Sequence, residues 1–341
     1  MINQAYQEAQ ISQYAQALFE VQEKKTCTKI ANKLNQAHDQ VIRFLDKTSR
    51  SLDRERGQLA LLAKKELNAD EIYFLGDDST MAKIFGSKFE GLEQVFDGST
   101  KRVVMGMKIV AAMLTDGIKK IPIDVANYVG KILGSSTYKS KSEILLEMFA
   151  WVGQKIAIAR LIADAHYVEA NFLQKIIDLS SNFLLKITRS RIVTIGEKTG
   201  QLRNLLRLQK NEHSRSASGS FQGIACYFHV VKIAKKITVY FITNDPISAL
   251  EACRLYKIRW NIETLFEVGK QHFGMAQCQA RSSEKQLAHI FQCMHAFAFA
   301  DLTRFRHDLP NIQSAIRLIR SQNRIKHVLD LSNGREVYAF A

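Results

Sequence analysis

The order of predicted strands and helices between residues 71 and 178 constrains the fold of this chain more than any other feature. This region begins with short apolar segments that have the character of β-strands, and an amphipathic helix follows them. These segments are Glu71–Asp78, Lys101–Gly117 and Ile118–Val129. A turn at Thr115–Gly117 would join the last two as a hairpin. The region therefore begins with strands, two of which are predicted to pair directly.

A helix and a further strand follow the hairpin. Ser140 begins a capping-box pattern in front of an amphipathic run, so a helix is predicted to start there. Ala157–Tyr167 is then predicted as a buried strand that ends at Asp164, and another helix reaches about Asp178. The complete order is strand, strand, strand, helix, strand, helix, which indicates an α/β fold.

The first 66 residues are predicted to be helical, because their apolar positions recur at helical spacing. Within them, Lys25–Lys47 fits two short helices around a turn near Gln36–His38. This pair resembles a helix–turn–helix that binds DNA, although an ordinary helical hairpin has the same pattern. The second helix would carry three polar side chains outward: Gln40, Arg43 and Lys47.

Between residues 183 and 243 the sequence returns to strands. They are predicted at Phe183–Ser190, Phe221–Val231 and Lys236–Thr243. The segment Lys186–Arg215 carries eight basic and two acidic residues, so it is either a DNA-contacting arm or a solvated surface. We favour the arm, because contact with a phosphate backbone requires such cations. Helices are predicted from residue 247 to about 305, and residues 306–341 form a tail that is helical and then irregular.

The charge of the chain favours a polyanionic partner. Lys and Arg number 48 against 33 for Asp and Glu, which gives a net charge of +15 and a pI near 9.6. Such an excess is typical of nucleic-acid-binding proteins, although a merely basic soluble protein would share it. Five scattered cysteines, without a C-x-x-C pair, fit a reducing cytoplasm. We find no secretory signal and no apolar run long enough to span a membrane.

Two predicted strands end in carboxylates. Asp78, or its neighbour Asp77, ends the first strand, and Asp164 ends the strand that follows the helix. Side chains at strand ends of one rigid sheet meet at a shared cleft, although an isolated aspartate there usually caps the next turn. The apolar pattern alone leaves Asp77 and Asp78 as alternatives.

A third carboxylate lies on the predicted helix Tyr256–Lys270. At about 100° per residue, Glu263 and Glu267 fall within about 20° of Tyr256, on the face that also carries Arg259. A solvated face with helical ion pairs would look similar. Helical geometry does not choose between Glu263 and Glu267.

Carboxylates that converge from strand ends and a helix form a site for hard cations. Mg²⁺ prefers such oxygen ligands and keeps waters or phosphate oxygens in its shell. Two Mg²⁺ ions about 4 Å apart can activate the attacking oxygen and stabilise the leaving oxygen in phosphodiester chemistry. We therefore expect two Mg²⁺ ions as cofactors, with Mn²⁺ as a possible substitute.

The spacing of four residues carries a resemblance to a known family. Tyr256 is followed after two residues by Arg259, after three more by Glu263 and after six more by Lys270. This spacing resembles the Y-R-E-K signature of bacterial insertion-sequence transposases of the insertion-sequence-four type, which are DDE transposases. The sequence "RWNIETLFEVGK" around it is similar to the family's helix. The resemblance extends over about residues 70–305.

Two further blocks resemble the family's aspartate motifs. "FLGDDSTMAK" is similar to the first block and favours Asp78, because Ser79 follows it; "LIADAHYVEANFL" is similar to the second and contains Asp164. The resemblance implies three catalytic, metal-binding carboxylates, with Glu263 chosen over Glu267 by the signature. They are Asp78, Asp164 and Glu263. It also implies three residues that contact DNA near the cleaved end: Tyr256, Arg259 and Lys270.

The resemblance also implies an architecture. A ribonuclease-H-like catalytic domain, with a mixed sheet and helices, would cover residues 70–305 and contain a β-rich insertion at about 185–243. Residues 1–66 would form a helical DNA-binding region, and residues 306–341 a C-terminal tail.

The implied function is metal-dependent cleavage of DNA at transposon ends, followed by strand transfer into target DNA. The partners would be double-stranded DNA, as terminal inverted repeats and as target, bound by a homodimer at the bacterial nucleoid. Two alternatives stay open. One is a ribonuclease-H-like nuclease without strand transfer, and the other is a non-enzymatic, DNA-binding remnant of a transposase.

Overall fold

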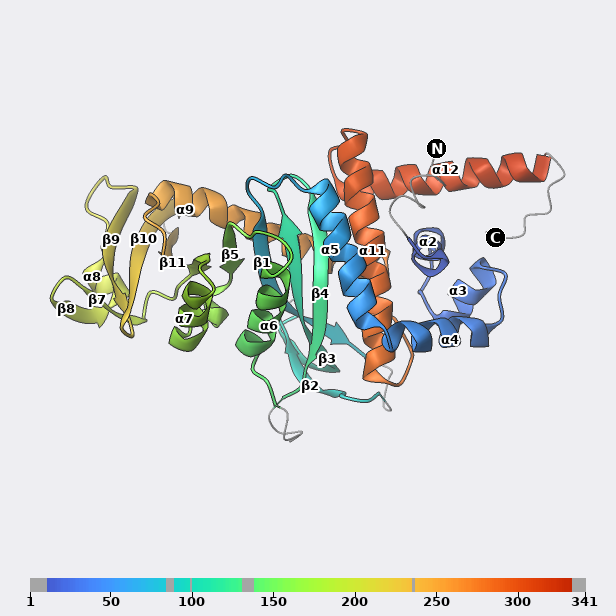
Figure 1. The fold of residues 1–341 in the computed structure, drawn as a ribbon, viewed down its shortest axis with the longest axis horizontal. Helices are drawn as coiled ribbons and strands as arrows, with labels where there is room; N and C mark the ends of the chain where they lie inside the picture. The colour runs from blue at the N-terminus through green and yellow to red at the C-terminus, as the bar shows by residue number, and fades with distance from the viewer. Residues whose placement is uncertain (1–10, 84–88, 99, 131–137, 235–236, 333–341) are drawn as a thin grey trace.

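One mixed β-sheet of eleven strands occupies the centre of the molecule and extends to one end of it (Figure 1). The computed structural model describes residues 11–83, 89–98, 100–130, 138–234 and 237–332. The predictions for residues 1–10 and 333–341 lie outside this range. Across the part of the chain that is described, no helix is both long and apolar enough to cross a lipid bilayer.

Five strands form the central part of the sheet. They are β1 (Tyr73–Ala82), β3 (Arg102–Thr115), β4 (Lys120–Tyr128), β5 (Arg160–Ala163) and β6 (Asn182–Lys186). Their order is β4–β3–β1–β5–β6, in which β1, β5 and β6 are parallel and β3 runs antiparallel to both of its neighbours. This is the ribonuclease-H-like arrangement, so the predicted fold class is confirmed. The predicted hairpin is the β3–β4 pair, and a short strand, β2 (Glu93–Asp97), pairs with the first half of β3.

The β-rich insertion continues this sheet. Its elements are β7 (Ile192–Ile195), β8 (Lys198–Gln201), α8 (Leu202–Leu205), β9 (Ser214–Phe221), β10 (Ile224–Ala234) and β11 (Ile237–Thr243). Strand β11 runs antiparallel to β6, with Phe241 opposite Lys186, and the order continues as β10–β9–β7–β8. The inserted strands therefore belong to the same hydrogen-bonded sheet as the strands that carry the aspartates.

Helices cover both faces of the central strands. One face carries α6 (Lys141–Gly153) and α7 (Ala170–Asp178); the other carries α9 (Ala249–Tyr256) and α10 (Trp260–His272), which a 3₁₀ turn at Lys257–Arg259 joins. The predicted capping box starts α6: the Ser140 hydroxyl accepts a hydrogen bond from the backbone N–H of Glu143, whose carboxylate accepts one from Ser140. This prediction is confirmed.

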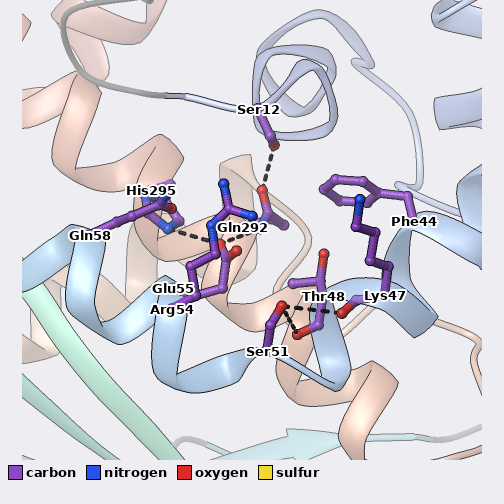
Figure 2. A pocket seen from close by; sticks show the side chains of 10 residues that line it. All are labelled: Ser12, Phe44, Lys47, Thr48, Ser51, Arg54, Glu55, Gln58, Gln292 and His295. Carbon is purple, nitrogen blue, oxygen red and sulfur yellow. Dashed lines mark hydrogen bonds and ion pairs between the residues drawn. The ribbon is translucent and has the colours of Figure 1, made fainter.

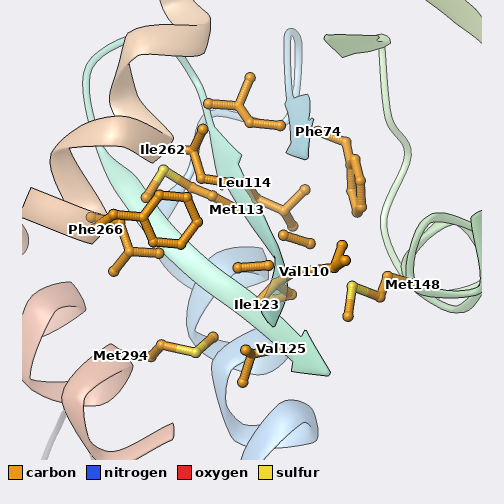
Figure 3. Close-up of a cluster of buried hydrophobic side chains, with 14 of the residues drawn as sticks. Phe74, Val110, Met113, Leu114, Ile123, Val125, Met148, Ile262, Phe266 and Met294 are labelled. Carbon is orange, nitrogen blue, oxygen red and sulfur yellow. The ribbon is translucent and has the colours of Figure 1, made fainter. Parts of the chain in front are cut away.

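Buried apolar side chains fill the space on both sides of β1. The ring of Phe74 packs edge-on against Phe149 of α6, with ring centroids 5.2 Å apart. Figure 3 shows Phe74 and Met148 on one side of the strands and Ile262 and Phe266 of α10 on the other. Because both faces are covered, β1 is a continuous apolar run up to its aspartates and shows no alternation.

A long buried helix, α11 (Ser283–Arg306), connects the sheet to the helices from both ends of the chain. It contacts β4 on one side and α2 (Gln13–Glu20), α4 (His38–Ser49) and α12 (Ile312–Ser332) on the other, and α3 (Cys27–Lys33) packs against α4 (Figure 1). The helix α5 (Leu52–Glu66) lies beside α11 and contacts both α11 and β4. The residues of α11 from Gln286 to Thr303 are nearly all buried, as expected for a helix that is packed all round. One hydrophobic core runs from the N-terminal helices into the sheet.

Candidate active site

Asp77 and Asp78 lie within β1, at the point where the neighbouring strand ends. Gly76 pairs with Ala163, the last residue of β5, and Asp164 follows directly. On its other side β1 stays paired with β3 as far as Ala82. The end of β5 therefore leaves one edge of β1 open at the two aspartates, next to Asp164.

The two adjacent aspartates face opposite sides of the sheet, because successive residues of a strand alternate. Asp78 lies on the α6 side, 2.9 Å from the Nζ of Lys141 and 3.6 Å from the Nζ of Lys108. Asp77 lies on the other side, where its Oδ2 accepts a hydrogen bond of 2.8 Å from Nη1 of Arg259. The structure thus brings Asp77, and not the predicted Asp78, to the helix that carries Glu263.

Arg259 links two carboxylates. Its second terminal nitrogen, Nη2, donates to Oε1 of Glu263, one turn further along the chain, while Nη1 donates to Asp77. The third carboxylate, Asp164, accepts a hydrogen bond of 3.2 Å from the Tyr256 hydroxyl rather than capping the turn that follows it. Two residues predicted to contact DNA therefore hold the three carboxylates in place.

Burial shifts the pKa of two groups at this site, Asp77 and Tyr256. It raises the pKa of Asp77 to about 6; the positive charge of Arg259 and the backbone N–H of Asp78 oppose the rise, and the charges of Asp78 and Asp164 add to it. Burial likewise raises the pKa of the Tyr256 hydroxyl, so this group stays a neutral donor at neutral pH. An anionic carboxylate and a neutral phenol are the forms that the observed hydrogen bonds require.

Lys270, the last residue of the predicted signature, and Glu267, the alternative carboxylate, lie apart from the cluster. Glu267 is exposed, one turn beyond Glu263. Lys270 is half-buried; burial lowers the pKa of its ammonium, and the negative charge of Asp97 opposes the shift. Lys270 is seven residues beyond Glu263, which is about 10 Å along a helix axis. The side chain of Trp260 is 64% exposed.

The donor set fits a hard divalent cation in its chemistry. Asp77, Asp164 and Glu263 offer the carboxylate oxygens that Mg²⁺ prefers. A cationic group, the guanidinium of Arg259, already lies between Asp77 and Glu263, so the charge of this position also suits a cation. As arranged, however, no three acidic, histidine or cysteine side chains of the described residues stand close enough together to hold a metal.

A second cluster of cations lies on the insertion. Arg189 and Arg203 line a depression of about 290 Å³ together with Tyr240 of β11. Burial raises the pKa of the Tyr240 hydroxyl, and the nearby charges of Arg189, Arg207 and Arg203 oppose that rise. Within the described residues, Arg203 and Arg207 donate only to neutral groups, and none of the three arginines forms an ion pair. All three belong to the basic segment identified in the sequence.

The predicted helix–turn–helix consists of α3 and α4, joined at residues 34–37. Val41 and Leu45 are buried, and Ile42 is only partly buried. The three side chains predicted to point outward, Gln40, Arg43 and Lys47, are exposed.

A polar pocket of about 240 Å³ lies beside α4, between α2, α5 and α11 (Figure 2). In it, Gln292 donates to Glu55 at 2.8 Å and accepts from the Ser12 hydroxyl. Arg54 and Lys47 also line this pocket. Its hydrogen bonds tie α2 and α5 to α11.

The fold and its acidic residues define a ribonuclease-H-like protein with carboxylates on β1, after β5 and on a helix. A comparison with protein families matches residues 78–299 to the transposase DDE domain, and the chain belongs to that family. No curated protein sequence was found to match it.

Among solved structures, the chain is similar to a piggyBac transposase in a cryo-EM structure of its synaptic complex with hairpin DNA. The TM-score is 0.48 at 11% identity, and the similarity covers 74% of this chain and 52% of that chain. The matched region thus spans about half the length of that protein.

Proposed function

We propose that the chain is a transposase of the insertion-sequence-four type, with Asp77, Asp164 and Glu263 as its catalytic carboxylates. The observation that carries the proposal is the convergence of these three side chains on Arg259 and Tyr256. The chain's membership of the transposase DDE domain family supports it. The insertion-sequence-four type is proposed from the spacing of four residues: Tyr256, Arg259, Glu263 and Lys270.

Asp77 replaces Asp78 as the proposed first carboxylate for a geometric reason. Asp78 is bound by two lysines on the α6 side, whereas Asp77 shares Arg259 with Glu263. The family match begins at residue 78, one residue after Asp77. The side-chain contacts favour Asp77, because the first residue of a match does not determine which side chain faces the site.

The three carboxylates would hold two Mg²⁺ ions, or Mn²⁺ in their place. Such ions supply activation of the attacking oxygen and stabilisation of the leaving oxygen. Tyr256 orients Asp164 through its hydroxyl. Arg259 and Lys270 would bind phosphates of the transposon end, Arg259 through two parallel hydrogen bonds and Lys270 as a point charge.

The proposed reaction has two phosphoryl-transfer steps. In the first, a water oxygen bonds to the phosphorus at the transposon end, and the bond from that phosphorus to the 3′ oxygen breaks. In the second, the freed 3′-hydroxyl bonds to a phosphorus of target DNA and expels the 3′ oxygen there. Each step forms one phosphorus–oxygen bond and breaks another. Neither step therefore requires an oxidant or a reductant.

DNA would be bound by several parts of a homodimer. Residues 1–66 are proposed to contact the transposon end through α3 and α4. The unpaired arginines of the insertion would contact the backbone, because DNA carries a phosphate charge about every 1.7 Å along its axis. Residues 70–305 would supply the catalytic site.

A cleavage and joining assay tests the proposal. The substrate is duplex DNA from both flanks of the gene, where terminal inverted repeats are expected, incubated with the full chain, Mg²⁺ and a target plasmid. We expect cleavage at the repeat ends and covalent joining of the 3′ ends to the plasmid. Cleaved ends that never join would favour a nuclease, and DNA binding without cleavage would favour a non-enzymatic remnant.

The arginines of the insertion give a separate prediction about DNA affinity. The double substitution Arg203→Gln and Arg207→Gln is expected to weaken duplex binding and to reduce the slope of log affinity against log salt by about 1 to 2. The measurement is fluorescence anisotropy over a salt series. The control is Lys101→Gln with Arg102→Gln, which removes the same charge from two exposed positions: the turn residue before β3 and the first residue of β3. Equal changes in both double variants would mean that only overall charge matters.

A further inference from the structure

Arg259 has two incompatible tasks if the site is static. It is proposed to bind a DNA phosphate, yet both of its terminal nitrogens donate to the carboxylates Asp77 and Glu263. Its side chain is only 13% exposed, so little of it faces solvent or a ligand. A divalent cation would need the same two carboxylate oxygens. The observed contacts therefore describe a closed site.

The position of Arg259 in the chain allows it to move. It is the last residue of the 3₁₀ turn that joins α9 to α10. A 3₁₀ stretch between two α-helices often marks a functional hinge. In addition, its Nε is buried without a hydrogen-bond partner, so the closed arrangement leaves one guanidinium donor unsatisfied. Both features fit a side chain that can leave the closed position.

We propose that Arg259 is a latch that keeps divalent metal out of the carboxylate site until a DNA phosphate draws its guanidinium away. The inference rests on the proposed function, because it takes Asp77 and Glu263 as metal ligands and DNA as the partner. It adds an order of events: DNA binding assists metal loading.

The physical basis is an exchange of partners that keeps charge balanced. A guanidinium binds phosphate in the same two-pronged manner in which it now bridges Asp77 and Glu263. Once Arg259 pairs with phosphate, the carboxylates lose their positive partner and attract a divalent cation. By thermodynamic linkage, metal must then strengthen DNA binding by the same factor by which DNA strengthens metal binding.

Binding of Mn²⁺ to the full chain tests the latch without any cleavage step, through the electron paramagnetic resonance signal of the free ion. The wild-type chain is expected to bind Mn²⁺ about tenfold more tightly when a short blunt DNA duplex is present, which is within the usual range of site couplings. Arg259→Gln removes the latch. It is expected to bind Mn²⁺ about tenfold more tightly than wild type without duplex, and to gain less than about threefold from duplex.

Lys257→Gln is the matched control, because it removes one positive charge from the same turn at an exposed position. It should keep both the wild-type Mn²⁺ affinity and the effect of duplex. Arg259→Lys keeps the charge but reaches one carboxylate at a time, so it should also bind Mn²⁺ more tightly than wild type. This variant decides the question if Arg259→Gln does not fold.

The latch is overturned if the Arg259 variants bind Mn²⁺ no more tightly than wild type, or if Lys257→Gln matches Arg259→Gln. Failure of the proposed function would appear elsewhere, as an absence of joining in the strand-transfer assay. The two failures are therefore distinguishable, because Mn²⁺ binding in the absence of duplex does not depend on cleavage, joining or a transposon end.

Discussion

Asp77→Asn is expected to reduce cleavage at transposon ends by more than about a thousandfold, the scale for a group that acts directly on the transition state. Asparagine keeps the shape of the side chain but lacks the negative charge that a divalent cation needs. Asp78→Asn should reduce cleavage by only about tenfold to a hundredfold, as for residues that support a site from behind it. Its carboxylate binds Lys141 and Lys108 on the α6 side of β1.

Single-turnover cleavage of an end duplex in Mg²⁺ measures both variants of this pair. Circular dichroism and duplex binding serve as controls, because loss of Asp78 leaves two lysines without their acidic partner. A larger loss in Asp78→Asn than in Asp77→Asn would return the role of first carboxylate to Asp78. Equal losses would mean that the face of β1 does not decide the role.

The central sheet could be predicted because its signals are local. Apolar runs separated by a short turn indicated the hairpin of β3 and β4, and the capping box at Ser140 indicated the start of α6. Each of these depends on residues within a few positions of one another. The ribonuclease-H-like order came from the resemblance, because strand order depends on contacts between distant parts of the chain.

Several strands did not follow from the apolar pattern: β2, β7, β8 and β9 were not predicted, and β1 is longer than predicted. Two of them, β1 and β9, show the reason. β1 was expected to end at Asp78, yet Ser79–Ala82 continues the ladder with β3. β9 has the sequence SRSASGSF, which has little apolar alternation, and it is a strand because β10 offers a complete antiparallel partner. In both cases pairing with a neighbour overrides the local preference, which is the usual weakness of strand propensity.

The choice between Asp77 and Asp78 could not be made from the sequence for a related reason. A strand covered on one face shows alternation, which reveals the direction of every side chain. β1 is covered by α6 on one face and α10 on the other, so "YFLG" is apolar throughout. Nothing in the pattern then says which aspartate shares a face with Glu263.

Side-chain directions were easier to predict for the helix Tyr256–Lys270 than for β1, because residues three and four positions apart lie on the same helical face. The spacing of Arg259 and Glu263 correctly indicated that these two side chains meet. The same geometry grouped Lys270 with them, but a helical projection ignores distance along the axis. The 3₁₀ turn at Lys257–Arg259, which the sequence did not indicate, interrupts the α-helix between Tyr256 and Trp260 and contains Arg259 itself.

Glu263→Gln is expected to abolish cleavage to the same extent as Asp77→Asn, whereas Glu267→Gln should leave cleavage within about threefold of wild type. Glu263 contacts Arg259 beside Asp77; Glu267 is one turn away and exposed. The pair is matched, because both substitutions remove one carboxylate from the same helix and keep its length. Single-turnover cleavage in Mg²⁺ measures the effect, and Mn²⁺ binding should weaken only in Glu263→Gln. Cleavage that survives Glu263→Gln and fails in Glu267→Gln would move the third carboxylate one turn along α10, away from Arg259.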